Sequence, residues 1–161
     1  MDAVRLSVLR AEVRGQLNKI ERVVVILEER ASEWAPNDAA TVESVAYQVH
    51  NFYSATEDLM KIVANAFENS ITDLSQWHTQ LLNRMTLEIE GVRPALLTTE
   101  TAALLHELRA FRHLFRHAYS TTLDFSRVEQ NVVRARQVRT LLTRDVDAFF
   151  ETLKVSESRD E

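Results

Sequence analysis

The chain has 161 residues and a mass of 18.5 kDa, the size of one ordinary domain. Its 45% hydrophobic and 27% charged residues exclude a disordered chain, and only two Gly and two Pro exclude turn-rich all-β and collagen-like folds. The lack of Cys excludes disulfides, thiolate metal sites and a cysteine nucleophile. Because no membrane-length apolar stretch or secretory signal is recognisable, we expect a cytoplasmic protein of long helices that does not bind a membrane.

The net charge of −5 is unevenly distributed along the chain. Residues 105–144 carry eight basic residues against three acids, whereas the segments on either side are acidic. All eight basic residues are arginines, whose planar guanidinium groups favour recognition of phosphate or carboxylate. The basic segment therefore indicates local binding of an anion, and the alternative is that these arginines are simply helix formers on solvated faces.

Apolar residues recur at spacings of three and four through most of the sequence, which predicts amphipathic helices. The first helix is expected from about Leu6 to Trp34 and should end at residues 35–38, where a proline lacks the backbone donor. A second helix is expected from about Val42 until residues 69–70. Its apolar face is unusually wide, so we expect it to be the central helix.

The next part of the chain predicts two further helices. A shorter third helix is expected over residues 73–89, and Gly91 and Pro94 should break the chain after it. The fourth helix should open at Thr98 or Thr99 and be interrupted at residues 120–122.

A last helix completes the expected fold. The pair Ser126 and Glu129 has the spacing of a capping box, which would place the start of this helix at Ser126. We therefore predict an all-α, single-domain, up-and-down bundle of about five helices over residues 1–155, followed by a polar tail over residues 156–161.

Residues 108–119 form the densest group of candidate functional side chains. On a helix, Phe111 and Phe115 should point toward the core, and the basic side chains should form a ridge on the outside. The ridge consists of Arg109, Arg112, His113, Arg116 and His117. Glu107 is the only acid nearby, so the ridge is left with uncompensated repulsion, which favours a functional origin over a structural one.

Two chemistries fit this ridge. His113 and His117 are spaced by four residues as metal ligands can be, but no carboxylate or third ligand is adjacent, so we assign no metal site. The other chemistry is proton transfer by His117 beside arginines that hold a phosphate. This set suits metal-independent cleavage of RNA, in which the 2′-hydroxyl of the substrate is the nucleophile.

The pattern Arg112-x4-His117-x-Tyr119 resembles the R-x4-H-x-Y motif of HEPN-domain ribonucleases of the HepT-like toxin group, which pair with minimal nucleotidyltransferase antitoxins. The resemblance extends over roughly residues 74–124. It includes the segments 77–85, 92–97, 105–119 and 123–124.

The resemblance implies a homodimeric, metal-independent endoribonuclease without cofactor, whose expected substrate is RNA, with transfer RNA the family-level expectation. It makes Arg112 and His117 the catalytic pair and Tyr119 the residue to which the antitoxin transfers AMP. Arg109, His113 and Arg116 are then expected to bind RNA. Two alternatives stay open: a non-catalytic helical subunit that binds a nucleotidyltransferase or presents its substrate, and a helical adaptor in which the ridge has no function.

Several other residues receive no functional role from the sequence. His50, His78 and His106 are isolated and are interpreted as surface or satisfied histidines, and Tyr53 and Trp77 as core or interface residues. Arg139 lies on the apolar stripe of the last helix, where it either extends to solvent or lines a basic cleft.

Overall fold

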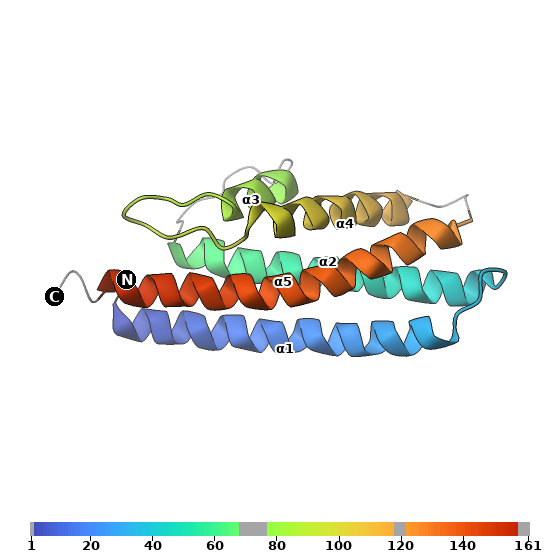
Figure 1. Ribbon diagram of the computed structural model, residues 1–161, viewed down its shortest axis with the longest axis horizontal. Coiled ribbons are helices and arrows are strands. Elements are labelled where there is room, and N and C mark those ends of the chain that lie inside the picture. The colour runs from blue at the N-terminus through green and yellow to red at the C-terminus, as the bar shows by residue number, and fades with distance from the viewer. Residues whose placement is uncertain (1, 68–76, 118–121, 158–161) are drawn as a thin grey trace.

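The computed structural model describes residues 2–67, 77–117 and 122–157, with the side chains of residues 77–79 and 155–157 left out. Within these ranges five helices pack as a single bundle, which confirms the expected fold class (Figure 1). The helices are α1 (Ala3–Glu33), α2 (Ala39–Phe67), α3 (Trp77–Met85), α4 (Thr99–His117) and α5 (Phe125–Glu157).

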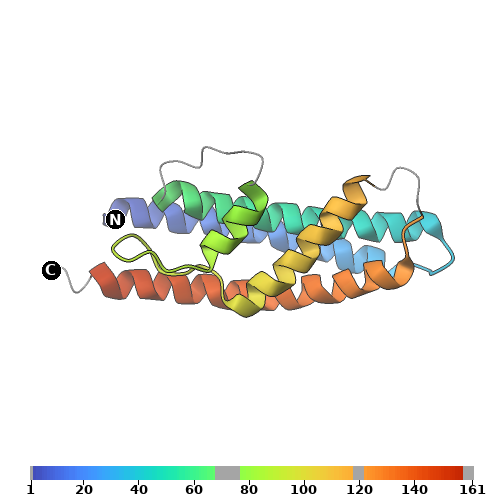
Figure 2. The same ribbon diagram turned by 90° about the horizontal axis from the view of Figure 1, so that it is seen from above.

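The helices form two layers. The three long helices α1, α2 and α5 run side by side, and α3 and α4 lie across them (Figure 1). Seen from above, α4 starts over α5 and crosses diagonally until its C-terminal end lies over α2 (Figure 2). The bundle thus brings the end of α4, which carries the basic residues, against the first half of α2.

Helix α2 is the centre of the bundle, as its wide apolar face predicts. It packs against each of the other four helices, and its buried residues include Val49, Phe52 and Tyr53, which are 0% exposed. Residues of α2 therefore lie beneath α4 on one side and against α1 on the other.

The expected capping box at the start of the last helix is wrong. Helix α5 begins at Phe125, one residue before Ser126, and the carboxylate of Asp124 accepts the backbone N–H of Ser126 at 3.3 Å. Aspartate caps a helix as well as serine does, and the earlier start brings the Phe125 ring within 4.3 Å of the Trp34 ring centroid. At its other end α5 continues to Glu157, so the first two residues of the predicted tail are helical.

The connection between α3 and α4 is held by a buried arginine. Helix α3 ends at Met85, four residues earlier than expected, and Gly91 then adopts a φ of 71°, which favours glycine. The Arg93 side chain donates to the backbone carbonyls of Arg84, Leu87 and Pro94 at 3.0–3.1 Å. The chain therefore leaves α3 along a fixed path to the start of α4.

The start of α4 is attached to α5 through a buried carboxylate. Asp145 of α5 accepts hydrogen bonds from the backbone N–H and hydroxyl of Thr98 and from the hydroxyl of Thr101 at 2.6–3.0 Å. Burial alone raises the pKa of Asp145, but the hydrogen bonds from Thr101, Thr98 and Arg144 outweigh it and lower this pKa. Asp145 thus fixes where α4 begins and, with it, the direction of the whole helix.

Asp145→Ala should lower the free energy of unfolding by about 2–3 kcal/mol, because it leaves the Thr98 and Thr101 donors without their charged acceptor. The native pKa of Asp145 lies below its ordinary value, about 3.9 in the unfolded chain. The stabilisation by ionised Asp145 is therefore complete at pH values above the unfolded-state pKa, and it is lost as the pH falls through the lowered native pKa. Denaturant unfolding from neutral pH to about pH 3 measures it.

The exposed neighbour Asp147 gives the matched control for this prediction. Asp147→Ala should change the free energy of unfolding by less than about 0.5 kcal/mol. A difference between wild type and Asp145→Ala that grows below about pH 4 would contradict the assigned sign.

Among the helices that the structure describes, none is long and apolar enough to cross a membrane.

Candidate nucleic-acid interface on α4

The basic residues of α4 form two neighbouring rows. Arg109, Arg112 and Arg116 are directed toward α2, and the first two are half-buried. His113 and His117 are exposed, and their ring centroids lie 4.5 Å apart. Residues five apart on an α-helix are rotated by roughly 140° around its axis, so Arg112 and His117 belong to different rows. The inward side of the same helix carries Phe111 and Phe115, which pack on the core as expected.

Arg112 lies over two residues of α2. Its Nε donates to the hydroxyl of Ser54 at 3.4 Å, and its Cζ lies 6.0 Å from the centroid of the Tyr53 ring. The second distance is within the range of a cation–π interaction. The guanidinium is therefore supported from below by α2 while its outer edge stays accessible.

Four of the five arginines of α5 are arranged differently, because acids from neighbouring helices and from α5 itself pair with them. Arg136 makes a two-fold hydrogen-bonded pair with Glu28 of α1 at 2.7 and 2.8 Å. Arg139 does the same with Glu21 of α1. The other two pairs are Arg134 with Glu107 at 3.7 Å and Arg144 with Asp145 at 3.0 Å.

The fold thus divides the basic segment into two groups. Arg112 and Arg116 have no ion-pair partner among the described residues, whereas Arg134, Arg136, Arg139 and Arg144 of α5 all have one. Of the two roles left open for Arg139 in the sequence, extension to the surface is the observed one, where it joins α5 to α1. Among the described residues of this segment, arginines without an ion-pair partner are therefore Arg112 and Arg116 on α4 and the exposed Arg127 at the start of α5.

His50 belongs to the same region, although its isolated position in the sequence gave no reason to include it. Its ring lies 5.6 Å from Phe115 and stacks on Tyr47 at 6.3 Å, and its Nδ1 is buried with no hydrogen-bond partner in the described structure. Burial lowers the pKa of His50, and the charges of Arg112 and Arg116 lower it further, so the ring is neutral at pH 7. The spacing of Tyr47, His50 and Ser54 along one face of α2 was the signal in the sequence.

The remaining expected residues are placed as follows. His106 is a satisfied histidine, as interpreted, because its Nε2 lies 3.0 Å from the Asn83 side-chain oxygen. Tyr53 is a core residue. The side chains of Trp77 and His78 and all of Tyr119 lie outside the described residues, so their placement stays a prediction. No group of three or more His, Asp and Glu suited to a metal ion occurs within the described part of the chain.

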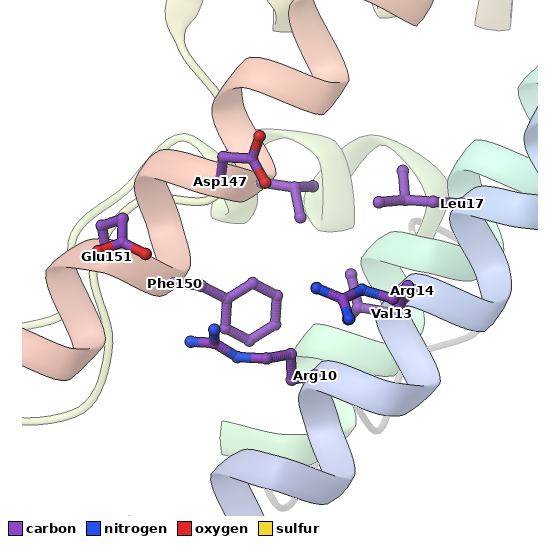
Figure 3. Close-up of a pocket in the computed structure, with 8 residues that line it drawn as sticks. Arg10, Val13, Arg14, Leu17, Asp147, Phe150 and Glu151 are labelled. Carbon is purple, nitrogen blue, oxygen red and sulfur yellow. The ribbon is translucent and has the colours of Figure 1, made fainter.

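A shallow pocket between α1 and α5 lies at the far end of the bundle. Arg10 and Arg14 extend from α1 toward the Phe150 ring, with Asp147 and Glu151 on the same side of α5 (Figure 3). The Arg10 guanidinium stacks over Phe150 at 4.8 Å from the ring centroid. Because two carboxylates balance its two arginines, this pocket lacks the unbalanced positive charge of the α4 rows.

Together, these features define an all-helical bundle with an arginine and histidine surface on its fourth helix. The model of the HepT-like protein family matches residues 44–153, which is more than half of the chain and includes most of α2 and α5. The chain belongs to the HepT-like family. The comparisons with curated protein sequences and with solved structures return no match.

Proposed function

We propose that this protein is an endoribonuclease toxin that cleaves RNA without a metal ion and is paired with a minimal nucleotidyltransferase as antitoxin. Transfer RNA is the first candidate substrate, on the resemblance to HEPN ribonucleases. Arg112 and His117 are its catalytic residues, and Arg109, His113 and Arg116 bind the RNA backbone. The observation that carries the proposal is that Arg112 and Arg116 of α4 have no acidic partner among the described residues and lie beside two exposed histidines.

The proposed reaction needs proton transfer and charge stabilisation, both of which α4 can supply. The 2′-oxygen of the RNA attacks the adjacent phosphorus, the bond from phosphorus to the 5′-oxygen breaks, and the products are a 2′,3′-cyclic phosphate and a 5′-hydroxyl. One imidazole takes the 2′-hydroxyl proton and an imidazolium gives one to the leaving oxygen. Arg112 stabilises the negative charge on the phosphorus oxygens.

Incubation of the purified, unmodified protein with total RNA in EDTA tests this proposal. Cleavage should continue with the divalent ions removed, and the new ends should be cyclic phosphates and 5′-hydroxyls. Absence of cleavage from protein shown by mass spectrometry to be unmodified would overturn the nuclease and favour the non-catalytic subunit that binds a nucleotidyltransferase.

Homodimerisation is expected because one copy offers an incomplete site. Its arginine and histidine rows lie on a convex helix surface that excludes little water, and one His117 cannot be both base and acid in the same step. Two α4 surfaces that face each other across a two-fold axis would supply two His117 imidazoles and a basic cleft. Sedimentation at micromolar concentration should therefore show a dimer, and a strictly monomeric protein with full activity would contradict this expectation.

Control by the antitoxin is proposed to act at Tyr119, two residues after His117 in the sequence. An AMP group on its hydroxyl would place a phosphate close to Arg112, Arg116 and His117, where it competes with the substrate phosphate. Protein co-expressed with its nucleotidyltransferase should carry added AMP on the peptide that contains Tyr119, as measured by mass spectrometry. Tyr119→Phe should still cleave RNA but escape inhibition, and modification at another residue alone would contradict the assignment.

A further inference from the structure

Tyr53 is buried beneath the proposed catalytic arginine with its hydroxyl unpaired. The residue is 0% exposed, and its hydroxyl has no hydrogen-bond partner in the described part of the structure. The Arg112 Cζ lies 6.0 Å from its ring centroid. Burial raises the pKa of Tyr53, as does the neighbouring Glu57, so the phenol is protonated at neutral pH.

Packing does not account for this hydroxyl. A buried polar group without a partner destabilises the fold, whereas phenylalanine would fill the same space without that penalty. The charges that act on the hydroxyl are those of Glu57 on its own helix and of Arg109 and Arg112 on α4. The Tyr53 hydroxyl destabilises the fold and lies beside the proposed catalytic Arg112, which indicates that it has a function involving Arg112.

We propose that Tyr53 is a positioning residue for Arg112, a role that rests on the proposed nuclease function. Its ring supports the guanidinium from below, and its hydroxyl accepts an N–H of the guanidinium when Arg112 turns toward the scissile phosphate. Ser54 accepts the Nε–H at 3.4 Å and forms the second contact. When the hydroxyls of Tyr53 and Ser54 both accept from the guanidinium, the outer N–H groups of Arg112 point at the phosphorus oxygens. Small errors in the orientation of a catalytic group slow a reaction strongly.

The first test observes Arg112 itself and is independent of activity. The Nε–H signal of Arg112 in a ¹⁵N NMR spectrum is assigned by its loss in Arg112→Lys. Its chemical shift and its rate of exchange with solvent are then compared between wild type and Tyr53→Phe, each bound to a 2′-O-methyl RNA. Tyr53→Phe should shift the signal and speed its exchange. Thr56→Val is the matched control, because it removes an equally buried hydroxyl of α2 whose hydrogen bond goes to the Phe52 carbonyl. An Arg112 signal that is the same in Tyr53→Phe as in wild type would overturn the proposal.

The second test separates positioning from stability. Tyr53→Phe should have a thermal midpoint equal to or above that of wild type, and should lower kcat by about 10- to 100-fold while KM changes little. Wild-type kcat in a stable Tyr53→Phe variant would overturn the role of Tyr53 and leave the nuclease intact. A wild-type protein inactive on RNA in EDTA would instead overturn the proposed function, and the NMR comparison would still show whether Tyr53 orients Arg112.

Discussion

Arg112→Ala is expected to lower the rate of RNA cleavage by at least about 10²-fold. The substitution removes the guanidinium that we propose binds the scissile phosphate and stabilises the charge that develops on its oxygens. The fold should persist, because Arg112 is only half-buried and its hydrogen bond to Ser54 is long, at 3.4 Å. Single-turnover cleavage of a defined RNA measures the rate, and thermal unfolding confirms that the variant is folded.

Two further variants make the Arg112 prediction specific. Arg112→Lys keeps the positive charge but loses the planar fork, so it should restore only part of the rate. Arg139→Ala is the matched control, because Arg139 belongs to the same basic segment of the sequence but pairs with Glu21 on α1. Full activity of Arg112→Ala would show that the assignment of the arginine row is wrong.

His117→Ala is expected to lower the cleavage rate by about 10²–10⁴-fold, because it removes the proposed proton-transfer group. Affinity for an uncleavable 2′-O-methyl RNA should change much less, since the arginine row that is proposed to hold the backbone stays intact. Because the His117 side chain is exposed, its loss creates no cavity and should not alter the thermal midpoint.

The His117 prediction has a control on the same helix. His106 lies about three turns before His117 on α4 and its ring is bonded to Asn83, so His106→Ala should cleave RNA at the wild-type rate. Retention of cleavage in His117→Ala, together with its loss in His106→Ala, would show that another histidine performs the proton transfer.

The sequence was sufficient to predict the helices and the family. Apolar residues spaced by three and four determine which face of each helix is buried, so five helices in one bundle and the central place of α2 followed from periodicity. The family resemblance was expected over residues 74–124, and the family match extends over 44–153. The sequence predicted the ends of helices less well. At the start of α5, Asp124 and Ser126 are both good capping residues, and the packing of Phe125 on Trp34 favours the start that Asp124 caps.

The sequence by itself determined that arginines gather between residues 105 and 144, but only the tertiary structure decided which of them are paired with an acid. Glu21 and Glu28 precede their arginine partners by more than 100 residues, and helix packing alone brings these charges together. The same packing places His50 and Tyr53 of α2 beneath Arg112, although the three share no sequence pattern. Ion pairs and burial depend on distances between helices, whereas periodicity describes each helix alone. For that reason the Arg112-x4-His117 pattern was visible in the sequence, but the contacts of α2 with Arg112 were not.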